Sequence, residues 1–306
     1  MKIAVIVKPP RTHKQRLTDE LALLQQGLPG ADIRILESEY AGHAIELSRA
    51  ATADADCIIA AGGDGTLNEV VNGCLQAQHQ NPEIKPPLVA VLAYGTANDF
   101  IKSAGLSGRM EQLISMLAAG HSRRIDVGYV HYREASGKPA ERYFLNEASV
   151  GIGADVARRV NRGRRRLGAT LTFIRSILLT FRKYRKPLCS VSSDTQRDRE
   201  GRLLALVAAN GRYFGSGLCI APRAELDDGK LSCTRIGDVT IQEFLQNLRR
   251  LKRGIAIAHP QVSYATARKI EVSTINGPCP VEADGEFLGY TPARVEVLPR
   301  RLRLLM

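Results

Sequence analysis

The chain has 306 residues, 44% of them hydrophobic, and a formal net charge of +12. Because this length exceeds one typical core, we expect about two domains. The composition excludes a disordered chain, and no run approaches the ~18 apolar residues of a membrane-spanning helix. The six cysteines contain no CxxC pair and the six histidines no HxxxH pair. This disfavours a zinc site and fits free thiols in a reducing compartment.

The first segment, 2–7, is apolar but too short for a signal peptide, and Lys8-Pro9-Pro10 ends it. We therefore expect a first strand and a cytoplasmic protein. Strand and helix patterns then alternate over residues 1–125, which favours a parallel sheet covered on both faces. The expected strands are 2–7, 32–36, 56–61 and 88–93. The expected helices are 14–26, 42–53, 67–78, 98–104 and 110–119.

Residues 126–306 show a different pattern of short alternating segments separated by glycine, proline and aspartate turns. Such a pattern is typical of a mainly antiparallel β domain. The expected strands are 127–133, 142–147, 203–208, 231–235, 270–273 and 294–298. Two helices, 168–182 and 240–257, interrupt them. A return of the last residues to the first domain stays open.

The most informative motif is Gly62-Gly63-Asp64-Gly65-Thr66, between an apolar strand pattern and a helix pattern. A glycine-rich turn from strand into helix points backbone N–H groups at one spot, near the positive end of the helix dipole. That geometry binds phosphate. Because Asp64 would repel bare phosphate, it indicates a site that holds a metal ion or relays a proton. Gly73, further along the helix pattern, suits a helix C′ position.

A second glycine turn, 94–100, follows the expected strand 88–93 and carries Asp99 in the opening turn of a helix. Either loop alone could be an ordinary turn from strand to helix. Two such turns after neighbouring parallel strands would form one crevice, where open α/β sheets bind ligands. The chain has no GxxxxGK[ST], no His-Arg-Asp loop and no GxGxxG. It therefore lacks the fingerprints of P-loop enzymes, protein kinases and dinucleotide-binding Rossmann domains.

Residues 62–73 and 95–100 together resemble the diacylglycerol kinase catalytic family, which includes soluble bacterial diacylglycerol kinases, sphingosine kinases and ceramide kinases. The resemblance continues at 146–156, 209–211, 221–231 and 284–286, and so covers nearly the whole chain. It implies an α/β nucleotide-binding domain over 1–125 of the NAD kinase and diacylglycerol kinase type. It also implies a β-sandwich over 126–306, with the active site between the two.

The resemblance implies ATP and Mg²⁺ as cofactors. The residues expected to contact ATP are Ser38, Gly62, Gly63, Asp64, Gly65, Thr66, Leu67, Asn68, Thr96 and Asn98. Asp64 and Asp99 would organise the Mg²⁺–phosphate cluster, and Asp126 would support it. The chain departs from the family at Lys8, where the family has an Asn-Pro, and Lys8 could contact phosphate instead.

The resemblance also places a proton acceptor at Glu286, with Asp284 beside it. The sequence does not decide whether Glu286 or Asp64 is the base. Standing alone, 284–286 would be interpreted as a hairpin turn. Asp228, with the carbonyls of Glu225 and Lys230, resembles a structural Mg²⁺ site, because oxygen ligands suit a hard cation. A plain Asp-Asp-Gly turn is the alternative there.

Eleven of the basic residues lie between Arg158 and Lys186, and this window has no acid. The run Arg164-Arg165-Arg166 leads into a predicted stripe of Leu167, Leu171, Ile174, Leu178 and Phe181. A basic amphipathic helix suits an anionic membrane surface. The alternative is that the stripe packs on the β domain and the arginines are solvated. Nucleic acid is not expected as a partner, since aromatic residues are not interleaved with the charges.

The sequence thus predicts an ATP- and Mg²⁺-dependent kinase that phosphorylates a lipid hydroxyl, peripherally bound at the inner membrane surface. An NAD kinase or a non-catalytic nucleotide or lipid sensor is the alternative. Diacylglycerol, a sphingoid base and a glycerophospholipid headgroup all remain open as acceptors. A homodimer also remains open.

Overall fold

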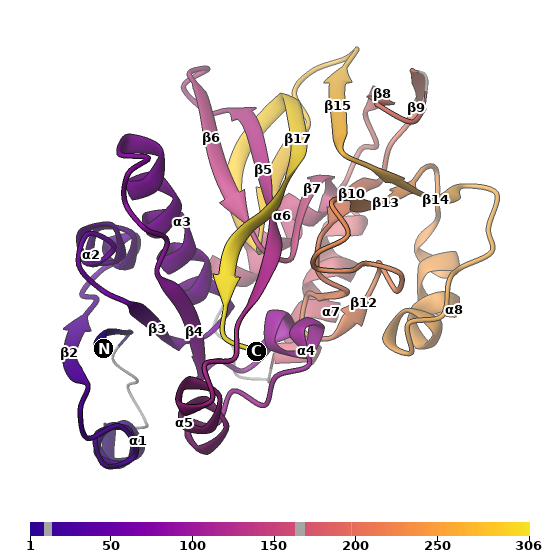
Figure 1. Ribbon diagram of the computed structural model, residues 1–306. Coiled ribbons are helices and arrows are strands. Elements are labelled where there is room, and N and C mark those ends of the chain that lie inside the picture. The colour runs from indigo at the N-terminus through magenta and orange to yellow at the C-terminus, as the bar shows by residue number, and fades with distance from the viewer. Residues whose placement is uncertain (9–13, 163–168, 197) are drawn as a thin grey trace. The chain divides into compact units, whose positions relative to one another are not determined.

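The computed structural model describes residues 1–8, 14–162, 169–196 and 198–306. The chain divides into two compact units (Figure 1). The first unit consists of Met1–Ile125 and Arg300–Met306, and the second of Asp126–Pro299. The last seven residues therefore belong to the same unit as the N-terminal half of the chain.

The first unit is built on a parallel sheet with the strand order β2-β1-β3-β4. Its strands are β1 (Lys2–Val7), β2 (Asp32–Glu37), β3 (Cys57–Gly62) and β4 (Leu88–Ala93). The end of β17 (Glu286–Leu304) extends this sheet, because Arg303 and Leu304 pair in parallel with Leu88 and Val89 of β4. All residues of β3 are buried, as expected for a central strand covered on both faces.

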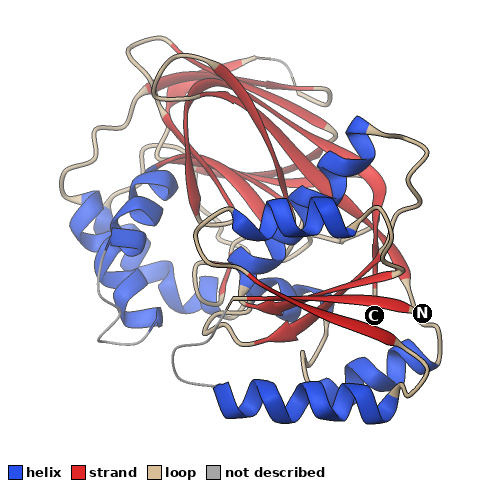
Figure 2. Cartoon of the chain, turned by 90° about the vertical axis from the view of Figure 1, so that its left-hand side faces the viewer, coloured by secondary structure: helices blue, strands red, loops and turns tan. Residues whose placement is uncertain are grey.

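Helices cover both faces of this sheet (Figures 1 and 2). They are α1 (Lys14–Gly27), α2 (His43–Ala51), α3 (Asp64–Gln80), α4 (Asp99–Ala104) and α5 (Met110–Ala118). Leu24 of α1 and Leu113 of α5 share one core cluster with Val5 and Ile59 of the sheet. Helices α2 and α3 pack closely on the other face, because Gly73 lacks a side chain. A Cβ there would lie 2.0 Å from Ser48 Oγ, so Gly73 permits a helix contact and does not end α3.

The second unit is a sandwich of two mainly antiparallel sheets that share β17, which confirms the predicted β-sandwich. One sheet has the order β14-β13-β10-β7-β16-β17, and in the other β17 lies between β5 and β15. The strands of the first sheet are β7 (Glu147–Gly151), β10 (Ala205–Ala209), β13 (Leu231–Ile236), β14 (Val262–Ala267) and β16 (Pro280–Ala283). The second sheet adds β5 (Arg123–Arg133), β6 (Pro139–Phe144), β8 (Leu188–Ser193), β9 (Arg199–Arg202) and β15 (Lys269–Thr274). Val150, Leu206, Ile270 and Val295 belong to the core between the sheets.

Among its described residues, the second unit also contains three helices and a short hairpin. The helices are α6 (Ile152–Arg162), α7 (Ala169–Phe181) and α8 (Ile241–Lys252), and the hairpin joins β11 (Tyr213–Phe214) to β12 (Leu218–Cys219). Phe181 and Phe244 lie 6.4 Å apart, centroid to centroid, in a core that α6, α7 and α8 share. No helix in the described ranges is both long and apolar enough to cross a membrane.

Several predicted boundaries were wrong in the second unit. Helix α6 was not predicted, and the end of β6 and the start of β7 were predicted as one strand. The helix after Thr240 was predicted to reach Ile257, whereas α8 ends at Lys252. The predicted stripe of α7 is also wrong in part. Phe173, Ile177 and Phe181 pack on the core, whereas Leu171 is 62% exposed. Arg164, Arg165, Arg166 and Leu167 lie outside the described residues.

Candidate functional site

The two glycine turns of the first unit touch each other through their backbones. They follow neighbouring parallel strands, in which Gly62 is the register partner of Ala93, and Tyr94 N donates to Gly62 O at 2.9 Å. A Cβ on Gly95 would lie 2.6 Å from Gly63 Cα. No side chain fits between the loops, so glycine is required for this close approach. The sequence analysis expected these turns to lie together, and they do.

The N-terminus of α3 opens at this contact. Its N-cap residue is Gly63, which offers no side-chain acceptor to the first N–H groups of the helix. Gly62 makes room for the first turn, because a Cβ there would lie 2.3 Å from Thr66 Oγ1. Backbone donors at the positive end of a 17-residue helix are chemically suited to a phosphate group.

Asp64 holds the second glycine turn to the first. Its two carboxylate oxygens accept hydrogen bonds from the backbone nitrogens of Asp99 and Phe100, each at 3.1 Å. These N–H groups belong to the first turn of α4, so Asp64 acts as a cap for that helix from another loop. The sequence predicted a nucleotide contact and a metal or proton role for Asp64, and the structure adds this positioning role.

Asn98 and Asp99 place further polar groups at the same loop. Asn98 has a left-handed backbone, with φ of 48°, and its Nδ2 donates to Gly95 O at 2.7 Å. Its Oδ1 is buried without a hydrogen-bond partner in the described part of the chain. Asp99 is 4% exposed and pairs with Lys102 at 3.2 Å. The loop therefore offers oxygen ligands as well as backbone donors.

The remaining predicted nucleotide contacts follow the carboxyl ends of the same strands. Ser38 follows β2 and donates its N–H to Val7 O, and Lys8 follows β1. Thr96 is exposed in the second glycine turn. Leu67 and Asn68 are 1% and 3% exposed. Their side chains are therefore part of the interior, and only their backbone could meet a ligand.

In the second unit, Asp284 and Gly285 form the turn between β16 and β17. Both have positive φ, 48° and 80°, and their neighbours Ala283 and Glu286 pair across the hairpin. A two-residue turn of this kind is the type I′ turn that Asp-Gly favours. The hairpin interpretation of the motif is therefore right, and Glu286 lies exposed at the start of β17.

The Asp284 side chain fastens this hairpin to the neighbouring strand. One carboxylate oxygen accepts from Leu145 N at 2.8 Å, and the other accepts from Asn146 N at 2.8 Å and Glu147 N at 3.1 Å. Asp284 N donates in return to Glu147 O. Three backbone donors on one carboxylate fix the direction of the turn and therefore the position of Glu286.

A buried pair of carboxyl groups lies under the same turn. Glu147 and Glu282 are each 2% exposed, and Glu282 accepts from Ser149 Oγ and from Gly285 N. Burial raises the pKa of Glu147 well above its usual value, and the adjacent Glu282 and Asp284 raise it further. Burial also raises the pKa of Glu282, although hydrogen bonds from Glu147, Ser149 and Gly285 oppose that shift. The pair therefore retains a proton above the usual range of a carboxyl group.

Asn210 links this region to the acidic turn before β13. Its Nδ2 donates to Asp126 O and Leu145 O, each at 3.1 Å, and its N–H donates to Asn146 O at 2.8 Å. Asp126 is fully buried, and one of its oxygens accepts from Gly229 N at 2.6 Å. Asp126 thus anchors the turn that carries Asp228, and its predicted support of an Mg²⁺–phosphate cluster remains a prediction.

The predicted structural Mg²⁺ site is an exposed turn in this structure. Asp228 Oδ1 accepts from Lys230 N at 2.9 Å, and the side chains of Glu225, Asp228 and Lys230 are exposed. The described residues contain no group of three or more His, Cys, Asp or Glu side chains suited to a metal. A metal at this turn would depend on backbone carbonyls, as the sequence analysis expected, and the assignment remains a prediction.

The predicted residues thus fall into two groups. One group lies in and beside the two glycine turns of the first unit, and the other lies in the hydrogen-bond network around Asp284 in the second unit. The positioning roles of Asn146, Glu147, Asn210 and Glu282 were not predicted from the sequence. The first three residues lie inside the motifs 146–156 and 209–211 that carry the family resemblance. The signal for Glu282 was a carboxylate at a strand position facing the interior, two residues before Asp284.

Comparison with known proteins agrees with this organisation. Residues 2–130 match the model of the diacylglycerol kinase catalytic domain. Residues 146–306 match that of the YegS C-terminal NAD kinase beta sandwich-like domain. A diacylglycerol kinase from Staphylococcus carnosus is 28% identical over 305 residues, which cover 95% of this chain and 91% of that protein. One from Staphylococcus aureus strain MRSA252 is also 28% identical, over 98% and 91% of the two chains.

Solved structures share the fold. A crystal structure of a diacylglycerol kinase from Bacillus anthracis superimposes with a TM-score of 0.70 at 20% identity, covering 99% of this chain and 96% of the other. An NAD kinase from Archaeoglobus fulgidus, solved in complex with ATP, gives a TM-score of 0.54 at 14% identity, covering 100% and 94%. With two adjoining family models matched along the chain, the protein belongs to the diacylglycerol kinase catalytic-domain family of lipid kinases, with a second unit of the YegS C-terminal type.

Proposed function

We propose that this lipid kinase transfers the γ-phosphate of ATP to the hydroxyl group of diacylglycerol or a related lipid. The observation that carries the proposal is the backbone contact between the two glycine turns. At this contact, the N-cap residue of α3 is Gly63, so the N-terminus of the helix has no side-chain cap at the edge of the sheet. Such a surface binds phosphate oxygens closely because no side chain intervenes.

The residues of this loop pair fit an ATP–Mg²⁺ complex. Mg²⁺ is usually held by one or two carboxylates together with the substrate phosphates, so a dedicated protein cage is not needed. Asp64 and Asp99 supply carboxylates in adjoining turns, and the unpartnered Oδ1 of Asn98 supplies a further oxygen. Bound there, Mg²⁺ would offset the negative charge of the phosphates. The backbone donors of 63–66 would orient the nucleotide.

In the proposed reaction, the lipid hydroxyl oxygen forms a bond to the γ-phosphorus while the bond to the β,γ-bridging oxygen breaks. ADP leaves with that oxygen, and the hydroxyl proton passes to a carboxylate. We assign this acceptor to Glu286. Its support is that Glu286 is exposed at the start of β17, beside a turn that three backbone hydrogen bonds hold in place. Both oxygens of Asp64 already accept backbone hydrogen bonds.

The test is transfer of labelled phosphate from ATP to a panel of acceptors in mixed micelles, with and without Mg²⁺. The panel holds diacylglycerol, a sphingoid base, phosphatidylglycerol and NAD. We expect a labelled lipid that depends on Mg²⁺ and is lost in Glu286→Gln. Exposed Glu200 is outside every motif, and Glu200→Gln is the matched control. Labelling of NAD in preference to every lipid would overturn the proposal.

We further propose that α7 brings the enzyme to an anionic bilayer. Leu171 and Leu179 are 62% and 41% exposed on this helix, and Arg175 and Arg182 are exposed beside them. Apolar side chains flanked by cations are complementary to a membrane surface with negative headgroups. The opposite face of α7 packs on the core through Phe173 and Ile177, so the outward face is free for this contact.

Sedimentation with vesicles tests the membrane proposal. Leu171→Ser with Leu179→Ser, and separately Arg175→Glu with Arg182→Glu, should each reduce binding to vesicles rich in phosphatidylglycerol. Ile35→Ser on β2 removes a similarly exposed side chain, 48% exposed, and should bind as wild type does. Unchanged sedimentation of both α7 variants would refute the role of this helix while leaving the kinase assignment intact.

A further inference from the structure

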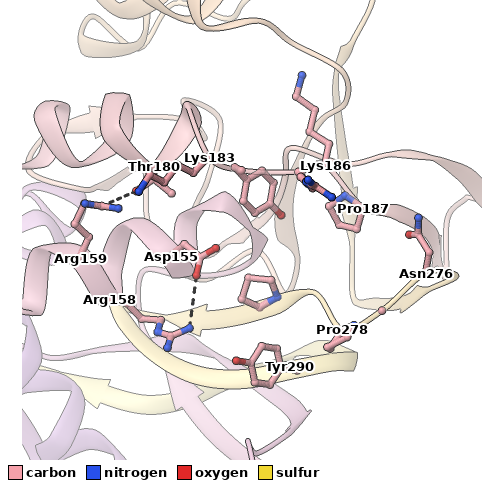
Figure 3. A pocket seen from close by; sticks show the side chains of 14 residues that line it. Asp155, Arg158, Arg159, Thr180, Lys183, Lys186, Pro187, Asn276, Pro278 and Tyr290 are labelled. Carbon is pink, nitrogen blue, oxygen red and sulfur yellow. Dashed lines mark hydrogen bonds and ion pairs between the residues drawn. The ribbon is translucent and has the colours of Figure 1, made fainter.

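The second unit contains a basic cavity whose lining includes none of the residues assigned to the proposed reaction. It has a volume of about 950 Å³ and lies between α6, the segment after α7 and the loop before β16 (Figure 3). Its lining includes five cations, and Asp155 is the carboxylate among them. The cations are Arg158, Arg159, Lys183, Arg185 and Lys186. No residue of the glycine turns or of 284–286 belongs to the lining.

The charges in this cavity are only partly compensated. Asp155 pairs with Arg158 at 3.7 Å, and Lys186 pairs with Asp238. Arg159 donates to a neutral acceptor, Thr180 Oγ1, at 3.1 Å. Within the ranges that the structure describes, neither Lys183 nor Arg185 has a carboxylate within ion-pair distance. The lining thus keeps an excess of positive charge. Because cations placed close together repel one another, an anionic ligand between them is favoured.

The walls of the cavity are partly apolar, and two of its cations make further contacts. Tyr184 and Tyr290 line it, together with Pro187, Pro278 and Pro280. Arg158 lies over the Phe287 ring at 4.5 Å, and Lys186 has a side chain only 16% exposed. The stacking contact fixes the direction of the Arg158 guanidinium, which can then offer parallel N–H groups to an oxyanion. Arg159, Lys183 and Arg185 are exposed, whereas Arg158 and Lys186 are held in place by these contacts.

We propose that this cavity is a binding site for a phosphate monoester that carries a small organic group. Guanidinium and ammonium donors from α6 and from residues 183–186 would surround the phosphate oxygens, and the tyrosine and proline walls would contact the organic part. The volume lies within the range of small-molecule sites and exceeds what a bare ion would fill. The phosphate can come from a soluble ester or from a phospholipid headgroup, because both present the same group to the cations.

The site is tested by calorimetric titration of the full chain with three probes. They are inorganic phosphate, glycerol 3-phosphate and a short-chain phosphatidic acid below its micellar concentration. The cavity variant is Lys183→Glu with Arg185→Glu. The matched control is Arg249→Glu with Arg250→Glu on α8, which changes the charge equally outside the cavity. We expect saturable binding to wild type, about tenfold or more weaker in the cavity variant and unchanged in the control.

Hydrogen exchange locates the bound probe, because the amides of 183–186 and 276–277 should gain protection in wild type. Binding of glycerol 3-phosphate indicates a soluble ester as the source, and binding of the phosphatidic acid alone indicates a headgroup. Three results would overturn the site: no saturable binding of any probe, equal weakening in both variants, or protection confined to the glycine turns. Because the readout is binding, loss of kinase activity would not affect this test, and failure here would not affect the proposed kinase reaction.

Discussion

Replacing Asp284 should loosen the turn that carries Glu286. In Asp284→Gly, the N–H groups of Leu145, Asn146 and Glu147 lose their acceptor while the positive φ of 48° is kept without strain. Hydrogen bonds to a charged acceptor contribute about 1.5–3 kcal/mol each in buried settings, and the lower end applies to these partly buried ones. With three such bonds lost, we expect local opening at these amides to become easier by about 4–5 kcal/mol.

Asp284→Asn is the matched variant, because asparagine also tolerates a left-handed backbone. Its carbonyl oxygen can replace the one that accepts from Asn146 and Glu147, but its amino group faces Leu145 N. The expected cost is about 1–2 kcal/mol, from the one lost bond. Exchange of the three amides, followed by NMR in a deuterated sample, measures both variants directly.

The expected free energies correspond to exchange that is on the order of a thousandfold faster in Asp284→Gly and about tenfold faster in Asp284→Asn. Wild-type protection of all three amides in Asp284→Gly would refute the positioning role of this carboxylate. If Asp284→Asn retains most of its protection and still loses activity, the charge of Asp284 also contributes to phosphate transfer.

Three further changes test the rest of the network. Asp64→Asn should retain one of the two backbone hydrogen bonds that cap α4, because its amino group cannot accept, whereas Asp64→Ala loses both and should destabilise the protein by about 1–2 kcal/mol in urea unfolding. Phosphate transfer at the wild-type rate in the asparagine variant would contradict a role for the charge of Asp64. Gly95→Ala should weaken nucleotide binding about tenfold or more in an equilibrium titration, because its Cβ would lie 2.6 Å from Gly63 Cα. The control is Gly30→Ala, because nothing lies within 4 Å of the Cβ added there. The raised pKa of Glu147 makes its contribution to stability full below the usual pKa of 4.5 and lost as pH rises through the folded-state value. Urea midpoints should therefore fall from about pH 5 upward in wild type and less steeply in Glu147→Gln, and parallel pH profiles would contradict this assignment.

The first unit was predictable because three of its strands, β1, β3 and β4, are buried along most of their length. Strands such as β3, with every residue buried, appear in the sequence as short apolar runs, and glycine turns mark their ends. The structural role of Gly73 could not be predicted from its residue type alone. Glycine is common at helix C′ positions, yet here it allows α2 to approach α3, and that partner is distant in the sequence.

In the second unit, local pattern was a weaker guide. Ile152, Val156 and Val160 are spaced by four and form the inner face of α6, so the helical signal was present. The dense arginines around them favoured a different interpretation, a surface run. Helix α7 is apolar around most of its circumference, and periodicity therefore fits more than one stripe. Only the partners of Phe173 and Ile177 in the folded unit show which stripe is internal.

Asp64 illustrates why a sequence identifies the chemical groups of a site better than the contacts that hold them in place. A carboxylate has about four acceptor positions, so Asp64 can cap α4 through both oxygens and retain lone pairs for a cation. Asparagine could accept only one of these two backbone bonds, because its amino group donates, so the cap as well as the charge requires a carboxylate. Because the two roles use the same oxygens, the capped loop holds the charge in a fixed direction before any ligand arrives. Preorganisation of this kind is what phosphoryl transfer requires, since positioning and charge stabilisation supply nearly all of its catalysis.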